Sequence, residues 1–192
     1  MVAYPDGLDG GWNSILCCND TDDVGFIRAL VDHARRRWRA DPDRVYATGA
    51  SAGAAMSYRL AAALPGVFAA IAPVSGALAD LDVPEGFPRT PVSLVAFHGR
   101  RDTIYDAMDE GVAAWRRRVG CLPPLVAPYA GGTVTRAVAR CRNGTDVVVY
   151  ELAEMGHAWP GAGGDDRLAA PGTPISATDL LWRFFEQHPR RR

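Results

Sequence analysis

Lysine is absent from this 192-residue sequence, and all 21 of its basic residues are arginine. With 22 acidic residues they give a formal net charge of -1, whereas a nucleic-acid-binding domain usually carries a clear positive charge. The arginine clusters at 35–37, 116–118 and 190–192 end expected helices or the chain itself, where positive charge complements the negative end of a helix dipole. The sequence therefore predicts no nucleic-acid surface.

Long apolar runs are also missing. No stretch approaches the roughly 20 apolar residues of a membrane span. The first seven residues have neither the basic region nor the apolar region of a signal peptide. Because 48% of the residues are hydrophobic and no change in composition divides the chain, we expect one core-bearing domain over residues 1–192. Because no apolar run is long enough, we expect no membrane span.

The four cysteines lack the paired spacing of a zinc site and the surroundings of a cysteine-protease nucleophile. Cys121 and Cys141 bracket a proline- and glycine-containing stretch, and we expect residues 121–145 to be rich in loops. A disulfide would constrain such a segment, which has little core of its own. The sequence thus predicts a bond between Cys121 and Cys141, an oxidising compartment and no metal site, and it leaves the pairing of Cys17 and Cys18 open.

Hydrophobic periodicity alternates between strand-like and helix-like segments. We expect a strand end at residues 2–4 and strands over 44–48, 68–73, 92–97 and 147–152. We expect helices over 22–39, 52–64, 105–119 and 176–187, the last opened by a Ser-x-x-Asp cap at Ser176. This alternation predicts the α/β class, with a mostly parallel sheet flanked by helices on both faces, and it places ligand chemistry at the carboxyl ends of the strands.

Residues 49–53 read Gly-Ala-Ser-Ala-Gly and lie between an expected strand and an expected helix. In that context a G-x-S-x-G motif indicates a nucleophile elbow, which lifts the hydroxyl of Ser51 out of the sheet. The backbone N–H of Ala52, at the start of the helix, is positioned by this motif to donate to an oxyanion. Taken alone, the motif also fits a glycine-rich turn that binds a phosphate or nothing.

A serine hydroxyl becomes a good nucleophile when a base removes its proton, and histidine is suited to this near neutral pH. Of the four histidines, His33 lies inside a helix and His188 lies near the chain end. His98 and His157 both follow expected strands. The order Ser, Asp, His that is typical of this strand–elbow–helix arrangement favours His157 as the base and leaves His98 a structural role.

The same chain order favours Asp102 as the acid that orients the base, because it follows a strand and lies between the serine and the histidine. Asp106 competes with it but belongs to the following helix. Asp165 and Asp166 come after the histidine.

The chain resembles the secreted polyhydroxybutyrate-depolymerase and feruloyl-esterase group of α/β hydrolases, including the mycobacterial-type lipoprotein esterases. The matching segments run in order over nearly the whole sequence: 4–7 with Trp12 and the cysteine pair 17–18, 22–26, 49–53 with Met56, 98–102, 156–161 and 176–185.

The resemblance implies hydrolysis of carboxylic esters, small or polymeric, outside the cytoplasm, with no metal or organic cofactor. It implies the same catalytic residues, Ser51, Asp102 and His157, that the local patterns favour. Trp12 and Trp159 then flank the site and form a wall for the acyl group, although packing in the core explains them equally well.

Members of this group begin several strands earlier, so the first three strands and a His-Gly segment that completes the oxyanion hole have no counterpart here. We therefore expect the sequence to be a fragment or to have a misplaced start. Two other functions remain open: an acyltransferase with the same fold, and a non-catalytic remnant or carbohydrate-binding module.

Overall fold

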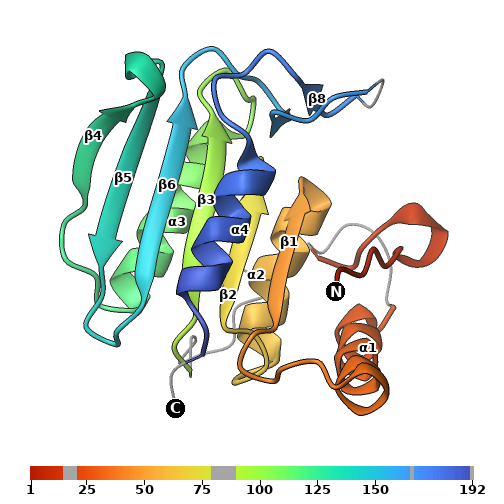
Figure 1. Cartoon of the computed structure of the whole chain (residues 1–192). Helices are drawn as coiled ribbons and strands as arrows, with labels where there is room; N and C mark the ends of the chain where they lie inside the picture. Colours follow the sequence, from red (N-terminus) through yellow and green to blue (C-terminus); the bar gives the residue numbers. More distant parts are fainter. Residues whose placement is uncertain (15–20, 79–89, 165–166, 191–192) are drawn as a thin grey trace.

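A computed structural model of the chain describes residues 1–14, 21–78, 90–164 and 167–190. Its main sheet has six strands in the order β1-β2-β3-β6-β5-β4, and a two-stranded sheet joins β7 and β8 (Figure 1). The strands are β1 Tyr46–Ala50, β2 Ala70–Val74, β3 Ser93–Gly99, β4 Leu125–Tyr129, β5 Val134–Arg140, β6 Asp146–Leu152, β7 Trp159–Pro160 and β8 Ala169–Ala170. The helices are α1 Asp23–Trp38, α2 Ala52–Ala63, α3 Tyr105–Arg118 and α4 Ala177–Gln187, with short 3-10 turns η1 Leu8–Gly10 and η3 Ala130–Gly132.

The strands β1, β2, β3 and β6 run parallel, so their carboxyl ends lie along one edge of the sheet. Every residue of β2 and β3 is buried. Such continuously buried strands are expected in a parallel sheet that is covered on both faces. This edge carries the loops on which the candidate site is built.

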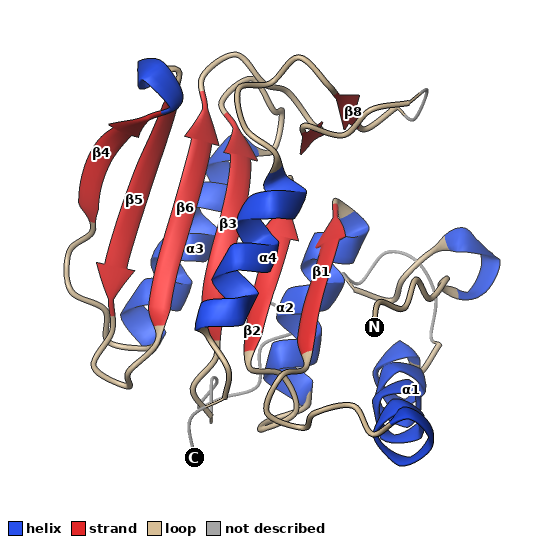
Figure 2. Ribbon diagram, in the orientation of Figure 1, coloured by secondary structure: helices blue, strands red, loops and turns tan. Residues whose placement is uncertain are grey.

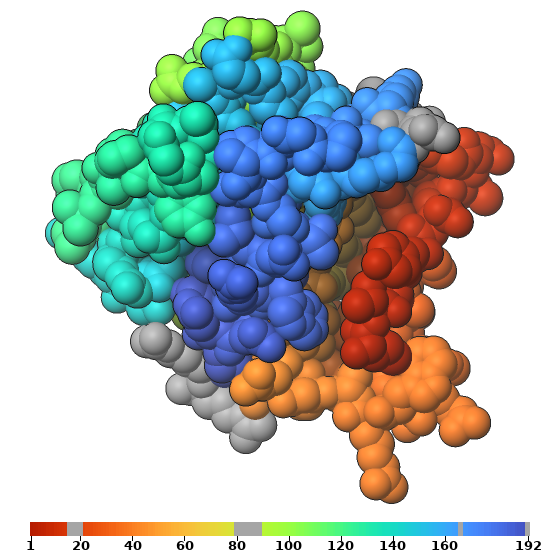
Figure 3. All heavy atoms as spheres, turned by 45° about the horizontal axis from the view of Figure 1, so that its top comes forward, coloured from red at the N-terminus to blue at the C-terminus, as the bar shows by residue number. Residues whose placement is uncertain are grey.

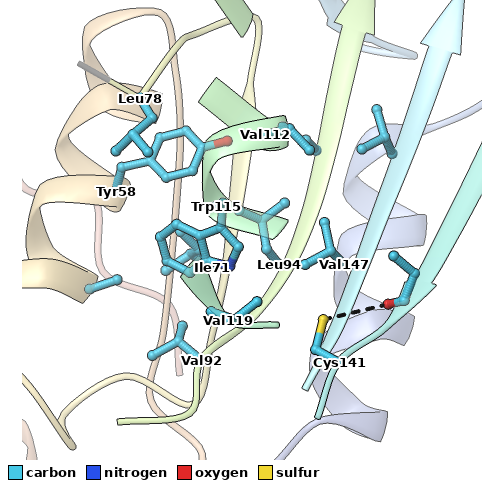
Figure 4. Packing of buried hydrophobic residues seen from close by; sticks show 14 of the residues in the cluster. Tyr58, Ile71, Leu78, Val92, Leu94, Val112, Trp115, Val119, Cys141 and Val147 are labelled. Carbon is cyan, nitrogen blue, oxygen red and sulfur yellow. Dashed lines mark hydrogen bonds between the residues drawn. The ribbon is translucent and has the colours of Figure 1, made fainter. Parts of the chain in front are cut away.

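Helices α2 and α3 lie on one face of the sheet and α4 lies on the other (Figures 1 and 2). Figure 4 shows the core on the α3 side, where Trp115 of α3 packs among Ile71 of β2 and Leu94 of β3. On the other face, Leu181 and Phe185 of α4 pack with side chains from the same strands. Each face therefore has its own apolar core, and α/β is the fold class.

The expected helices all form, with ends within two residues of their predicted bounds. The hydroxyl of Ser176 accepts a hydrogen bond from the N–H of Asp179 at 3.2 Å, which confirms the predicted cap of α4. The expected strands over 44–48, 68–73, 92–97 and 147–152 correspond to β1, β2, β3 and β6. Among the described residues, no helix combines the length and the apolar composition that crossing a bilayer requires.

Two local expectations are wrong. Residues 2–4 do not form a strand end, and Val2 and Tyr4 are 65% and 90% exposed, because no described strand runs beside them. The stretch expected to be loop-rich instead forms β4 and β5, an antiparallel hairpin that pairs with β6. Its prolines and glycines suggest loops, but Pro128 lies in β4 at the outer edge of the sheet, where proline is tolerated.

Strand β1 is the opposite edge of the main sheet and pairs only with β2 among the described strands. Its residues are half-buried or exposed, in contrast to the buried strands beside it. The chain passes directly from β1 into the turn that carries Ser51.

Candidate active site

Ser51 occupies the sharp turn between β1 and α2. Its backbone has φ 55° and ψ -116°, a strained conformation for a residue with a side chain. The turn is held because the N–H of Ser51 donates to the Val74 carbonyl at 3.0 Å, while the Ser51 carbonyl accepts from Ala54 at 3.0 Å. A Cβ atom at Gly49 would lie 2.6 Å from the Gly53 carbonyl carbon, so this close crossing of strand and helix requires a glycine.

Ala52 is the first residue of α2, directly after Ser51. The N–H groups of a helix's first turn have no carbonyl acceptor in a preceding turn. The Ala52 N–H is therefore available in principle to an anionic oxygen, and the positive end of the helix dipole favours such a charge.

Asp102 and His157 are brought together from loops that lie 55 positions apart in the chain. The Nδ1 atom of His157 lies 2.8 Å from the Oδ2 atom of Asp102. The other carboxylate oxygen, Oδ1, accepts a hydrogen bond from the N–H of Ile104 at 3.1 Å. The Asp102 side chain is fully buried, whereas the His157 side chain is 36% exposed. A carboxylate at Nδ1 selects the tautomer in which Nε2 can accept a proton.

The loops that carry Asp102 and His157 are fastened to each other by the backbone. The N–H of Arg101 donates to the Met155 carbonyl at 2.9 Å, and the N–H of Arg100 donates to the Leu152 carbonyl at 3.0 Å. A Cβ atom at Gly99 would lie 2.3 Å from the Met155 oxygen, so only glycine allows this approach.

Two ion pairs bridge the same junction. Arg100 pairs with Glu151 at 2.7 Å, and Arg101 pairs with Glu154. Figure 3, which turns the carboxyl ends of the strands forward, shows the β3–α3 loop next to the segment that follows β6. Asp102 and His157 therefore share one rim of the sheet with Ser51.

The competing residues lie elsewhere. His98 is buried in β3 and packs edge-on against Tyr105, with ring centroids 6.4 Å apart. Burial lowers the pKa of His98 to about 4, so this imidazole is neutral near pH 7 and adds no charge beside Asp102. Asp106 is exposed in the first turn of α3, and the candidates Asp165 and Asp166 lie outside the described residues.

The two remaining histidines have contacts away from this rim. His33 is exposed on α1 and stacks edge-on against Trp38. His188 follows α4, and its Nε2 atom lies 2.9 Å from Asp146 at the start of β6, the opposite end of the sheet.

The two candidate wall residues, Trp12 and Trp159, are both half-buried. Trp12 packs against the apolar cluster between α1 and α2, which includes Ile27 and Met56. Trp159 packs against the α4 core, and its indole N–H donates to the Thr178 hydroxyl at 3.1 Å. Each tryptophan therefore has packing partners in addition to any contact with an acyl group.

Cys121 and Cys141 form a disulfide, as predicted. It joins the end of α3 to the turn before β6, at the end of the sheet opposite the site. Cys17 and Cys18 lie outside the described residues. Within the described ranges, no group of three or more His, Cys, Asp or Glu side chains is arranged to hold a metal ion.

Two parts of the site had no assigned role in the sequence analysis. One is Gly99, whose need for glycine arises from the loop at Met155. The other is Ser75, which follows β2 and bonds to the loop that carries His157. The only hint in the sequence is the Ser-Gly pair that directly follows an apolar strand. The hydrogen-bond partner of Ser75, Ala158, lies 83 residues away and cannot be identified from the sequence.

Comparison with curated proteins gives relatives that carry esterase names. The protein NocK of Nocardia uniformis subsp. tsuyamanensis, named as an esterase, is 30% identical over 96% of this chain and 64% of its own length. Feruloyl esterase C of Emericella nidulans is 29% identical over 96% of this chain and 64% of its own length. Poly(3-hydroxyalkanoate) depolymerase C of Paucimonas lemoignei is 30% identical over 83% of this chain and 48% of its own length.

The chain is therefore similar, over most of its length, to proteins that carry esterase names. Among solved structures, an acetyl xylan esterase from Aspergillus awamori superposes with a TM-score of 0.66 over 92% of this chain and 73% of that chain, at 19% identity. The α/β-hydrolase fold predicted from the sequence is thereby confirmed. No family model matches the chain. The chain spans just under two thirds of the length of NocK and of feruloyl esterase C, 64% in each case.

Proposed function

We propose that this chain carries the catalytic residues of a serine carboxylic-ester hydrolase. The observation that supports this best is the 2.8 Å contact between the buried Asp102 carboxylate and the partly exposed His157 imidazole, on the rim that also bears Ser51. A buried acid, an accessible base and a strained elbow serine are the three parts that nucleophilic acyl transfer requires. The esterase names of the relatives agree with this chemistry.

In the first half-reaction, the Ser51 Oγ atom attacks the ester carbonyl carbon while the Nε2 atom of His157 takes the hydroxyl proton. Asp102 stabilises the resulting imidazolium through Nδ1. The imidazolium then donates its proton to the alcohol oxygen as the carbon–oxygen bond breaks, which leaves the acyl group on Ser51.

In the second half-reaction, His157 removes a proton from water, and the hydroxide attacks the acyl carbon. The imidazolium returns that proton to Ser51 as the acid departs. The N–H of Ala52 donates to the oxyanion in both tetrahedral intermediates. Every proton in this cycle is held by Ser51, His157, water, the leaving alcohol or the product acid.

We infer that the substrate is a carboxylic ester, as a small molecule or as part of a polymer such as a polyester or an esterified plant polysaccharide. The support is the names of the sequence relatives, feruloyl esterase and poly(3-hydroxyalkanoate) depolymerase, and of a structural neighbour, an acetyl xylan esterase. Trp159 stands two residues after His157, and for this reason we favour it over Trp12 as a residue that contacts the acyl group. The Cys121–Cys141 disulfide is consistent with an extracellular location.

The test compares wild type with Ser51→Ala, using p-nitrophenyl acetate turnover and labelling by a fluorophosphonate. Wild type should hydrolyse the ester and be labelled at one site, and Ser51→Ala should lose both properties. Ser93→Ala is the matched control, because this buried serine lies at the opposite end of β3. Turnover in Ser51→Ala that equals wild type, or a folded wild type that neither turns over nor is labelled, would rule out the proposal.

A further inference from the structure

Ser75 is a completely buried serine at the carboxyl end of β2, between the elbow and the loop that carries the base. Its φ is 46°, in the left-handed region that favours glycine. Its hydroxyl donates to the Ala158 carbonyl at 2.7 Å, and the N–H of Ala158 approaches the same oxygen at 3.3 Å. One side chain thus engages both backbone polar groups of the residue that follows His157.

The backbone around Ser75 is tied equally closely to the elbow. The preceding residue, Val74, accepts a hydrogen bond from the N–H of Ser51, and the N–H of Ser75 donates to the Phe97 carbonyl at 3.0 Å. A Cβ atom at Gly76 would lie 2.6 Å from the Ser51 carbonyl oxygen and 2.5 Å from the Cβ of Ala54. Residues 74–76 therefore contact the nucleophile's turn on one side and the base loop on the other.

We propose that Ser75 is a positioning residue that fixes the His157 imidazole relative to the Ser51 hydroxyl by holding the backbone at Ala158. The inference rests on the proposed function of this site and adds a residue to it. Ser75 does not touch the reacting atoms, and it acts through the backbone of the base loop.

The need for this contact follows from how His157 is held. Asp102 orients its ring at Nδ1, but one hydrogen bond leaves the imidazole free to pivot about that contact. On the N-terminal side the loop is held at Met155 by Arg101. Ser75 supplies the hold immediately after the base, and a displacement of about 1 Å in a catalytic group can lower a rate roughly 100-fold.

The positive φ of Ser75 allows the role of its hydroxyl to be tested separately from the role of its backbone conformation. Glycine adopts a positive φ without strain, so a site that needed only this backbone conformation would be met by glycine. Serine adds the hydroxyl that reaches Ala158. Ser75→Gly therefore removes the contact while relieving the strain, and Ser75→Ala removes the contact while keeping the strain.

The experiment measures kcat and KM for p-nitrophenyl acetate and the second-order rate of fluorophosphonate labelling in wild type, Ser75→Ala and Ser75→Gly. Both variants should lose about 10- to 100-fold in kcat and in labelling rate, while KM stays within about twofold. Ser93→Ala is again the control, because its buried hydroxyl accepts the N–H of Asp146 at 3.3 Å at the far end of the sheet. It should lose stability without losing kcat.

A second measurement does not depend on catalysis. Hydrogen–deuterium exchange of the peptide containing residues 156–160 should accelerate in both Ser75 variants and remain unchanged in Ser51→Ala, because Ser75 accepts the Ala158 N–H. A wild type without esterase activity would contradict the proposed function, whereas unchanged exchange in Ser75→Gly would contradict the positioning role by itself. In an active wild type, Ser75→Gly with kcat within twofold of wild type would also overturn the inference.

Discussion

Both carboxylate oxygens of Asp102 have partners: one contacts the backbone and the other contacts His157. Its Oδ1 atom accepts the N–H of Ile104, and its Oδ2 atom faces the His157 ring. Because one carboxylate oxygen is committed to the turn, the other has a fixed direction. The direction of the contact with Nδ1 is therefore set by the conformation of the β3–α3 loop.

Replacing this acid should abolish most of the activity without unfolding the protein. In Asp102→Asn, the amide can donate to Nδ1, which would favour the tautomer with the proton on Nε2, and a loss of about 10⁴-fold in kcat is expected. Turnover of p-nitrophenyl acetate and the thermal unfolding midpoint are the measurements. Asp106→Asn, at an exposed position four residues away, should retain wild-type kcat. More than a tenth of wild-type kcat in Asp102→Asn would contradict the assigned role.

The buried imidazole of His98 should make the stability of the protein depend on pH in the acid range. Burial lowers its pKa from 6.5 to about 4, and no hydrogen-bond partner contacts either ring nitrogen among the described residues. The unfolded state binds a proton near pH 6.5 and the folded state does not, so this group's contribution is complete above pH 6.5. It is lost as the pH falls toward 4, by about 3 kcal/mol in total.

The corresponding test is urea unfolding at pH 7 and pH 4.5 in wild type and His98→Gln. The decrease in unfolding free energy between the two pH values should be smaller in His98→Gln by about 2 kcal/mol or more. The exposed His33→Gln serves as the control and should show the wild-type decrease. An equal decrease in wild type and His98→Gln would show that His98 is not responsible.

The hairpin β4–β5 extends the sheet beyond β6 and is tied at its base to the end of α3. The N–H of Leu122 donates to the Arg140 carbonyl at 2.8 Å, next to the disulfide between Cys121 and Cys141. The disulfide spans a sequence separation of 20. It therefore secures a peripheral element and lies away from the rim that bears the candidate site.

Removing the disulfide should lower stability and leave the chemistry intact. For a loop of this length, Cys121→Ser combined with Cys141→Ser should reduce the free energy of unfolding by about 3 kcal/mol. Urea titration measures the change, and wild type titrated with and without a reductant provides the matched comparison. At 20 °C in the absence of urea, kcat should stay within about twofold of wild type, and a larger loss would show that the hairpin shapes the site.

The helices and the parallel strands were predictable because their patterns are local. A residue spacing that buries one helix face, or a continuous apolar run, is visible within a window of the sequence. The hairpin was missed because Pro128 and the nearby glycines suggest loops unless the edge position of β4 is known. Residues 2–4 are apolar and therefore suggest a strand end, but an apolar run forms a strand only beside a partner strand.

The site divides in the same way. The elbow motif and the order Ser51, Asp102, His157 can be identified in the sequence, and the pairing of the last two agrees with the structure. Ser75 and Gly99 could not be identified, because their importance comes from loops that reach them after folding.

The molecule has an apolar core on each face of the sheet and a further apolar cluster between α1 and α2. Trp115, with 0% exposure, is central to the core on the α3 side, whereas Trp182 of α4 is 49% exposed. Truncating the first leaves a cavity among close-packed neighbours, and truncating the second removes mostly solvated surface.

Trp115→Ala should therefore lower the free energy of unfolding by about 3–5 kcal/mol. Trp182→Ala, the same substitution at an exposed position, should lower it by less than about 1 kcal/mol. Urea unfolding followed by circular dichroism measures both values. Equal effects in the two variants would contradict the assignment of the α3 side as a main core.

The edge position of β1 favours its local opening before the protein unfolds globally. A strand with neighbours on both sides cannot leave without opening the sheet, but β1 is joined to β2 alone among the described strands, and it leads straight into the Ser51 turn. Local opening at such a margin costs less than global unfolding. Mild denaturant should therefore lower the activity while the helical signal is still intact, because β1 carries Ser51 at an edge of the sheet and can open without global unfolding.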